Sequence, residues 1–308
     1  MKHTTQRLLA LLLIPCLILG LFLATPKTVQ AESQALSIYV GEKLKNAFSN
    51  NVSRVTNSNP AVVEVSYNGN QISFKGIGTG GAVVSVWTTA TTVSMDYIFT
   101  VKDNANLFSV TYKMELPGIN QYVYEIKNKS NINFTQVEFD CYDNGRLLDL
   151  GDAKCSAYVL PAKGTCIGTI MTDKKLSAPK KIGFRASRLI RGNAMDNGKA
   201  VPKNAVTLKV AEPTLGKSYR KLRLINYKMT VTNTFEQNIG YEIYGYVYNS
   251  SGKMVGFIDS ALEDKGTLNR YQKRTNKWQY VIIKSSGDLK CKAWVNALPA
   301  TSSVLKAD

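Results

Sequence analysis

The sequence predicts an all-β chain of three consecutive β-sandwich modules, and three observations lead to this prediction. Short runs of β-branched and aromatic residues alternate with turns of Asn, Gly, Ser and Asp. Beyond the first 31 residues, almost no segment has the period of a helix. Two later stretches of the chain repeat one order of strands and turns.

Residues 1–31 have the pattern of a secretory signal peptide. Lys2 and Arg7 make a basic start, an apolar run follows over 8–24, and Val29-Gln30-Ala31 ends the segment. We expect cleavage after Ala31 and a protein that is secreted or held at the cell surface. An uncleaved membrane anchor is the alternative, although the apolar run is short for a span and contains Pro15.

The segment "FKGIGTGGAVVSVW" contains the spacing of a dinucleotide-binding loop at Gly76, Gly78 and Gly81. Such a loop needs a helix after the glycines, because the helix N-terminus holds the pyrophosphate. Here a run of Val and Thr follows instead, which is typical of a strand. We therefore predict that Gly76, Gly78 and Gly80 serve turn geometry and that no nucleotide binds.

The stretches "SNPAVVEV" and "NGNQISFKGIGTGGAVVSV" resemble the bacterial Ig-like domain of group 2, over residues 36–102. "RVTNSNP" and "SVW" are also similar to the N-terminal domain of pilus-assembly secretins. Both resemblances imply an extracytoplasmic β module without catalysis.

Residues 122–149 align with residues 227–256 as an internal repeat. Asn128 meets Asn233, Tyr142 meets Tyr248, and Gly145 meets Gly252. Each copy resembles the FxLYD-type module of secreted bacterial proteins, which implies an Ig-like sandwich. The predicted organisation is therefore a signal over 1–31 and Ig-like modules over 32–103, 104–211 and 212–308.

Composition argues against catalysis. The single histidine, His3, lies in the signal segment, so the mature chain has no imidazole for a catalytic triad or a metal. Glu138 and Asp140 alternate on one expected strand, where a solvated outer face is a better interpretation than a glycosidase pair. We predict that the protein is no enzyme and needs no cofactor or metal.

The positive charge is concentrated in one stretch. Residues 174–228 hold 15 basic and 2 acidic residues, whereas residues 32–173 hold 11 and 13. Such a one-sided field attracts polyanions such as teichoic acid, anionic lipid or acidic polysaccharide; a merely solvated face is the alternative. The candidate contacts are Lys180, Lys181, Arg185, Arg188, Arg191, Arg220, Lys221 and Arg223.

Two aromatic groups are further candidates. Alternation places Tyr244, Tyr246 and Tyr248 in a row on the face opposite the core, where they could stack on sugar rings or pack against a neighbouring module. "RYQKRTNKWQY" interleaves cations with Tyr271 and Trp278, a pattern that suits anionic glycan or single-stranded nucleic acid. Secretion argues against nucleic acid, and Trp278 could instead be a core residue.

Together these patterns predict non-catalytic binding or adhesion to an anionic envelope polymer, a glycan or another surface protein. The alternative is a structural or assembly subunit of a surface or secretion apparatus. For the thiols, we expect a disulfide between Cys155 and Cys166, with Cys141 and Cys291 unpaired. A bridge from Cys141 to Cys166 is the alternative pairing.

Overall fold

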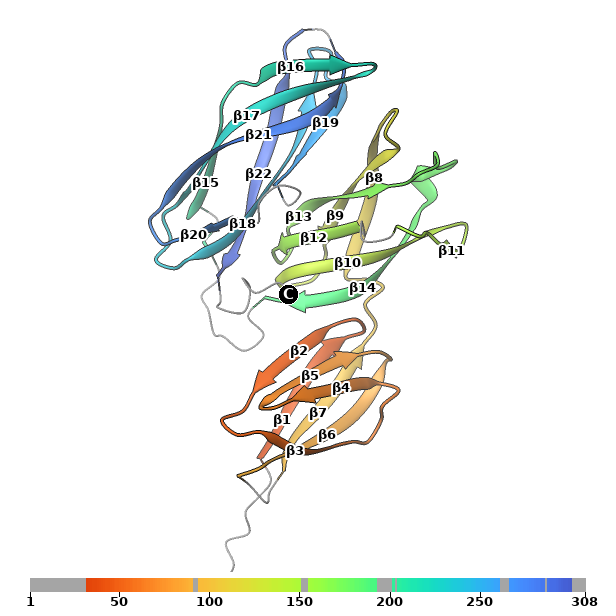
Figure 1. Cartoon of the computed structure of the whole chain (residues 1–308), viewed down its shortest axis with the longest axis vertical. Coiled ribbons are helices and arrows are strands. Elements are labelled where there is room, and N and C mark those ends of the chain that lie inside the picture. Colours follow the sequence, from red (N-terminus) through yellow and green to blue (C-terminus); the bar gives the residue numbers. More distant parts are fainter. Residues whose placement is uncertain are drawn as a thin grey trace, which may run out of the picture.

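The computed structural model describes residues 32–90, 94–150, 155–192, 201–202, 204–260, 266–285 and 287–300. Three β-sandwiches follow one another along the long axis of the molecule (Figure 1). The predicted all-β fold class is confirmed. The expected signal peptide lies outside the described residues, and within them no helix is long and apolar enough to cross a membrane.

The first module packs two sheets around one core, in which Phe74 contacts both Tyr97 and Phe99. One sheet has the order β1-β7-β6-β3, with β1 and β7 parallel, and the other has the order β2-β5-β4. The strands are β1 (Glu32–Tyr39), β2 (Lys43–Ala47), β3 (Val52–Asn57), β4 (Val63–Asn68), β5 (Gln71–Gly76), β6 (Gly80–Thr88) and β7 (Met95–Lys102).

The glycine-rich segment is a turn between strands, as predicted. It connects β5 of one sheet to β6 of the other. A Cβ atom on Gly76 would lie 2.6 Å from the Tyr39 carbonyl oxygen, and one on Gly78 would lie 2.5 Å from that of Ala61. Gly80 has a φ of +136°, which a side chain rarely permits. Each glycine therefore has a steric or conformational reason to be there.

The second module is a sandwich of the sheet β13-β9-β8 and a sheet in which β10 pairs with β11, β12 and β14. Its strands are β8 (Phe108–Leu116), β9 (Gln121–Asn128), β10 (Phe134–Asp143), β11 (Arg146–Leu147), β12 (Cys155–Leu160), β13 (Thr165–Met171) and β14 (Gly183–Arg191). A short 3-10 turn, η1 (Pro179–Lys181), precedes β14.

The third module repeats this pairing within one curled, eight-stranded sheet. β15, β16 and β21 pair with β17, whereas β19, β20 and β22 pair with β18; the single pair of Gly256 with Ile282 joins β19 to β21. The strands are β15 (Val206–Val210), β16 (Thr214–Tyr219), β17 (Leu222–Asn233), β18 (Ile239–Tyr248), β19 (Met254–Asp259), β20 (Gly266–Leu268), β21 (Lys273–Ile283) and β22 (Lys290–Pro299).

The predicted boundary between the second and third modules was wrong. We expected it after residue 211, but β15 pairs with β17, and Leu208 and Val210 pack against the core of the third module. Ala205 belongs to the same core. The third module therefore already includes residue 205.

Asn128 and Asn233 show that the internal repeat is structural. Both side chains are fully buried at the ends of β9 and β17. Asn128 donates to the carbonyl oxygens of Ile132 and Pro161, and Asn233 donates to those of Gln237 and Asn269. Each Oδ1 atom accepts from the backbone N–H two residues later. One buried asparagine thus fixes the same corner in both modules.

An ion pair joins the first module to the second. Glu42, which is fully buried, lies 2.8 Å from Nε of Arg191 on β14. Its other oxygen accepts from Arg191 Nη2 at 2.9 Å and from the Tyr39 N–H at 3.0 Å. The Leu189 N–H also donates to the Gly41 carbonyl oxygen. Buried charge is tolerated here because the carboxylate and the guanidinium form an ion pair, although the contact of Nε with Oε1 lacks the geometry of a hydrogen bond.

Candidate anion-binding surface

The structure divides the predicted basic residues between two modules. Lys180, Lys181, Arg185, Arg188 and Arg191 lie on η1 and β14 of the second module, whereas Arg220, Lys221 and Arg223 lie on the β16–β17 hairpin of the third (Figure 1). The prediction of one continuous basic contact was therefore wrong, because folding separates what the sequence places together.

Two of the arginines on β14 already have carboxylate partners. Arg191 binds buried Glu42, and Arg188 Nη1 lies 3.1 Å from Glu138 Oε1 on β10. Arg185 lies directly opposite Asp140 in the β10–β14 register. Glu138 on β10 and Glu42 of the first module therefore compensate two of the three arginines of β14. Arg188 and Arg191 are therefore weaker candidates for contact with a polyanion than their charge in the sequence indicated.

Lys180 and Lys181 remain exposed beside Arg185. Lys181 and Arg185 line an open hollow of about 570 Å³ together with Tyr142, Asn144 and Phe184. Asp143, next to this hollow in the sequence, accepts from the Asn144 side chain at 3.1 Å. The described lining of the hollow thus combines two cations with aromatic and amide groups.

The tyrosine row is covered, which decides between the two interpretations of this face. Tyr244 and Tyr246 are buried in the core of the second module. Tyr244 donates to the Tyr158 carbonyl oxygen at 2.7 Å, and Tyr246 donates to Glu125 Oε2 at 2.9 Å. Tyr248 is half-buried and packs against the same cluster. The alternative that this face packs against a neighbouring module is the one that the structure shows.

The remaining aromatic candidates separate. Trp278 is buried in the core of the third module, so it is no surface contact. Tyr271 lies in the turn before β21 with 69% of its surface exposed. Of this pair only Tyr271 is available to a ligand.

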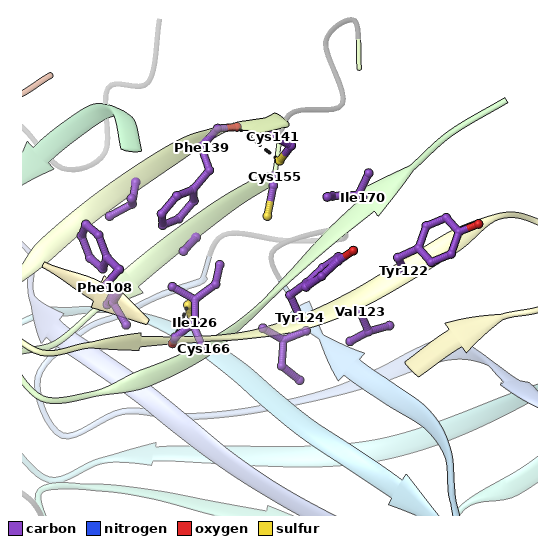
Figure 2. Close-up of a cluster of buried hydrophobic side chains, with 14 of the residues drawn as sticks. Phe108, Tyr122, Val123, Tyr124, Ile126, Phe139, Cys141, Cys155, Cys166 and Ile170 are labelled. Atoms are coloured by element: carbon purple, nitrogen blue, oxygen red, sulfur yellow. Dashed lines mark hydrogen bonds between the residues drawn. The ribbon is translucent and has the colours of Figure 1, made fainter. Parts of the chain in front are cut away.

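The predicted disulfide is absent from the structure, which holds Cys141, Cys155, Cys166 and Cys291 as free thiols. Figure 2 shows the Cys155 sulfur beside that of Cys141, with Cys166 apart from both, near Ile126. A hydrogen bond with Cys141, together with burial, raises the pKa of the Cys155 thiol. The predicted bridge from Cys155 to Cys166 was wrong because the two residues are close in the sequence but their sulfur atoms do not lie side by side.

A second group of cations lies on the outer face of β15, β17 and β21. We call this surface the lysine face; its exposed lysines are Lys209, Lys228, Lys273 and Lys277. Tyr244 on β18 and Trp294 on β22 donate to carbonyl oxygens of the second module, so that module is contacted by the strands on the other side of the core from the lysine face. The lysine face joins two basic stretches that are distant in the sequence, the one ending at Lys228 and the one around Lys273.

The register fixes the order of side chains on the lysine face. Lys228 lies directly opposite Lys277, and Thr232 lies opposite Lys273. Between these rows Thr230 and Thr275 share a hydrogen bond of 2.8 Å, and Lys209 pairs with Thr230 from the other side. Gln279 donates to Asn226 at 3.2 Å in the row beyond Lys277. The face is a ladder of lysines and neutral polar groups.

None of these lysines has a carboxylate within ion-pair distance in the described part of the chain. Like charges directly opposite on neighbouring strands destabilise a sheet by up to about 1 kcal/mol, because their Cβ atoms lie about 5 Å apart. Within the described residues, no ion pair compensates this cost for the pair of Lys228 and Lys277. An anion from solution would remove it.

The lysine face was not predicted as a unit, although the part on β21 can be recognised in the sequence. Lys273, Thr275, Lys277 and Gln279 are exposed and alternate with half-buried or buried residues along β21. What the sequence does not give is the pairing of β17 with β21, which brings Lys228 beside Lys277 across 49 residues. Long-range strand pairing was the missing information.

The described residues contain no group of three or more His, Cys, Asp or Glu side chains that could hold a metal ion. No family model matches the chain, and no curated protein matches it.

Solved structures show only weak likeness. A β-glucuronidase of glycoside hydrolase family 2 is 11% identical with a TM-score of 0.21, over 72% of this chain and 21% of that one, so the chain spans about a fifth of its length. A chimeric titin Z1Z2 tandem is 11% identical with a TM-score of 0.17, over 53% and 95% of the two chains. The SGBP-B protein of a Bacteroides ovatus mixed-linkage glucan utilization locus, in complex with a heptasaccharide, is 9% identical with a TM-score of 0.20, over 88% and 74%.

Proposed function

We propose that this chain is a non-catalytic binding protein, secreted or held at the cell surface, that contacts an anionic polymer or acidic glycan of the envelope. The observation that carries the proposal is the opposed pair of Lys228 and Lys277 on an exposed face where no described carboxylate lies within ion-pair distance of either lysine. Lysine is a flexible point charge, so such a face suits an array of negative charges more than one rigid ligand.

The dimensions of the lysine face favour a polymer. Lys273 and Lys277 are four residues apart on β21, which corresponds to about 13 Å along the strand. Lys209 lies two strands away from β21, about 10 Å across the sheet. One small anion cannot contact charges spread over this area, whereas a chain with repeated phosphate or carboxylate groups can.

A binding role without catalysis agrees with the state of the acidic residues. Glu138, one of the two carboxylates considered for catalysis, is engaged by Arg188 in an ion pair. The hydroxyl and amide groups between the lysines can donate to sugar or phosphate oxygens. We propose that they position the polymer, while the lysines supply most of the attraction.

The proposal is tested by binding the full chain to purified teichoic acid and to an acidic polysaccharide over a series of salt concentrations. Screening shortens the reach of exposed charges from about 10 Å at 0.1 M salt to about 3 Å at 1 M, so we expect affinity to fall at least about tenfold. Binding that survives molar salt unchanged would refute an electrostatic contact. Self-association without any polymer, seen by light scattering, would favour the assembly role instead.

A further inference from the structure

The β16–β17 hairpin differs from the lysine face because it combines cations with exposed apolar side chains. Tyr219 has 69% of its surface exposed and Leu215 has 55%. Both belong to β16, in which five of the six residues are exposed. Neither side chain contributes to the core of the third module. The hairpin therefore presents apolar surface that the fold itself does not use.

Cations surround these two side chains. The segment "TLGKSYRKLRL" over 214–224 contains Lys217, Arg220, Lys221 and Arg223 and no acidic residue. The Arg220 guanidinium lies 5.3 Å from the centre of the Tyr219 ring. Lys284 lies next to these cations in the fold, because its backbone N–H donates to the Lys221 carbonyl oxygen at 2.7 Å. The tip therefore has a high local positive charge.

The hairpin also has the position of a contact element. β16 lies at the end of the molecule opposite to the first module (Figure 1). Arg220, at the turn, has a φ of 50°, so the chain reverses tightly between Tyr219 and Lys221. Arg223 donates from Nε to Ser218 Oγ at 3.0 Å and ties the two strands together near the tip. The hairpin therefore ends in a compact, tied turn at this end of the molecule.

We propose that the tip of the β16–β17 hairpin is a peripheral binding site for anionic lipid bilayers. Tyrosine suits the boundary between headgroups and acyl chains, because its ring is apolar and its hydroxyl remains hydrated. Leu215 enters the same boundary, and the cations attract anionic headgroups, each strengthening binding several-fold. Charge alone explains attraction to a soluble polyanion; the exposed Leu215 and Tyr219 favour a bilayer, where apolar side chains leave water.

The test is co-sedimentation of the full chain with vesicles of phosphatidylcholine alone and of phosphatidylcholine with phosphatidylglycerol. We expect binding to the anionic vesicles only. The double variant Arg220→Glu/Lys221→Glu should lose at least about tenfold in vesicle affinity. Leu215→Ser/Tyr219→Ser should also lose several-fold, at unchanged charge. The matched control Lys228→Glu/Lys277→Glu makes the same charge change on the lysine face and should retain most of the vesicle binding.

A Tyr219→Trp variant locates the tip. Its additional fluorescence should be quenched by brominated acyl chains in anionic vesicles, above the baseline of the native tryptophans. Equal vesicle binding by both hairpin variants and the parent, or absence of binding to anionic vesicles, would overturn the inference. Teichoic acid binding through the lysine face would be unaffected by either outcome, because the two sites do not depend on each other.

Discussion

The strands β10 and β18 occupy the same position in two related modules, yet the outer face of β10 is paired with charged residues and that of β18 is buried against another module. On β10 the outer residues Glu138 and Asp140 face arginines of β14. On β18 the corresponding row begins with Tyr244 and Tyr246, which are buried against the second module. The corner asparagines are equivalent in both copies, so the shared fold and the outer chemistry are separable. Outer faces thus decide whether a strand joins modules or meets solvent.

The largest effect should come from breaking the covered face of β18. We expect Tyr244→Ala to lower the free energy of unfolding by about 3–5 kcal/mol, because it removes a fully buried aromatic ring and its hydrogen bond to Tyr158. Chemical denaturation measures this. Tyr219→Ala is the matched control: this tyrosine is exposed, and its loss should cost less than about 0.5 kcal/mol. Equal losses in the two variants would contradict the burial of β18.

The buried corner asparagine should contribute about equally to the free energy of unfolding in both modules. Asn128→Ala and Asn233→Ala each leave buried carbonyl and N–H groups without partners, and we expect each to cost about 2–3 kcal/mol. Hydrogen exchange should localise each loss to its own module. A large loss in one module and none in the other would show that the repeat is only superficial.

The joint between the first and second modules should respond to pH through Glu42. Burial raises the pKa of Glu42, and Arg191 offsets this only in part. The folded chain then holds this proton more tightly than the unfolded chain, so stability falls as pH rises from the ordinary carboxyl pKa of about 4.3 through the raised pKa.

Glu42→Gln removes the titrating group, so it is the reference. We expect the parent to exceed Glu42→Gln in free energy of unfolding by more near pH 4.5 than near pH 7.5. The lower pH lies close to the unfolded pKa of about 4.3. Denaturation at the two pH values measures this difference. A difference that grows as pH rises would mean that Arg191 outweighs burial and holds the carboxylate charged.

The smallest effect should come from the solvated face of β10. Arg188 is about half exposed, with a side-chain exposure of 46%, and its pair with Glu138 has one short contact. Such pairs contribute about 0–1 kcal/mol, so we expect Arg188→Ala to lower stability by no more than that in denaturation experiments. A loss of several kcal/mol would place this pair among the structural contacts, beside that of Arg191.

The sequence predicted strands, turns and local faces well, because these depend on neighbours along the chain. Alternation correctly placed Ile243 and Val247 in the core, and the Val-rich run after Gly80 correctly predicted β6. It failed wherever distant segments meet. The partner of Arg191 lies 149 residues away in another module, and the cover of Tyr244 lies 86 residues away. Nothing local marks those pairings.

The most direct test of the central claim compares two charge reversals of equal size. Lys228→Glu/Lys277→Glu changes the lysine face, and Arg185→Glu/Lys181→Glu changes the hollow beside β10 by the same net charge. Teichoic acid affinity at about 0.1 M salt, where charges reach about 10 Å, should fall at least about tenfold for the first and much less for the second. Equal losses would mean that net charge alone attracts the polymer, and a larger loss for the second would contradict the assignment of the site to the lysine face.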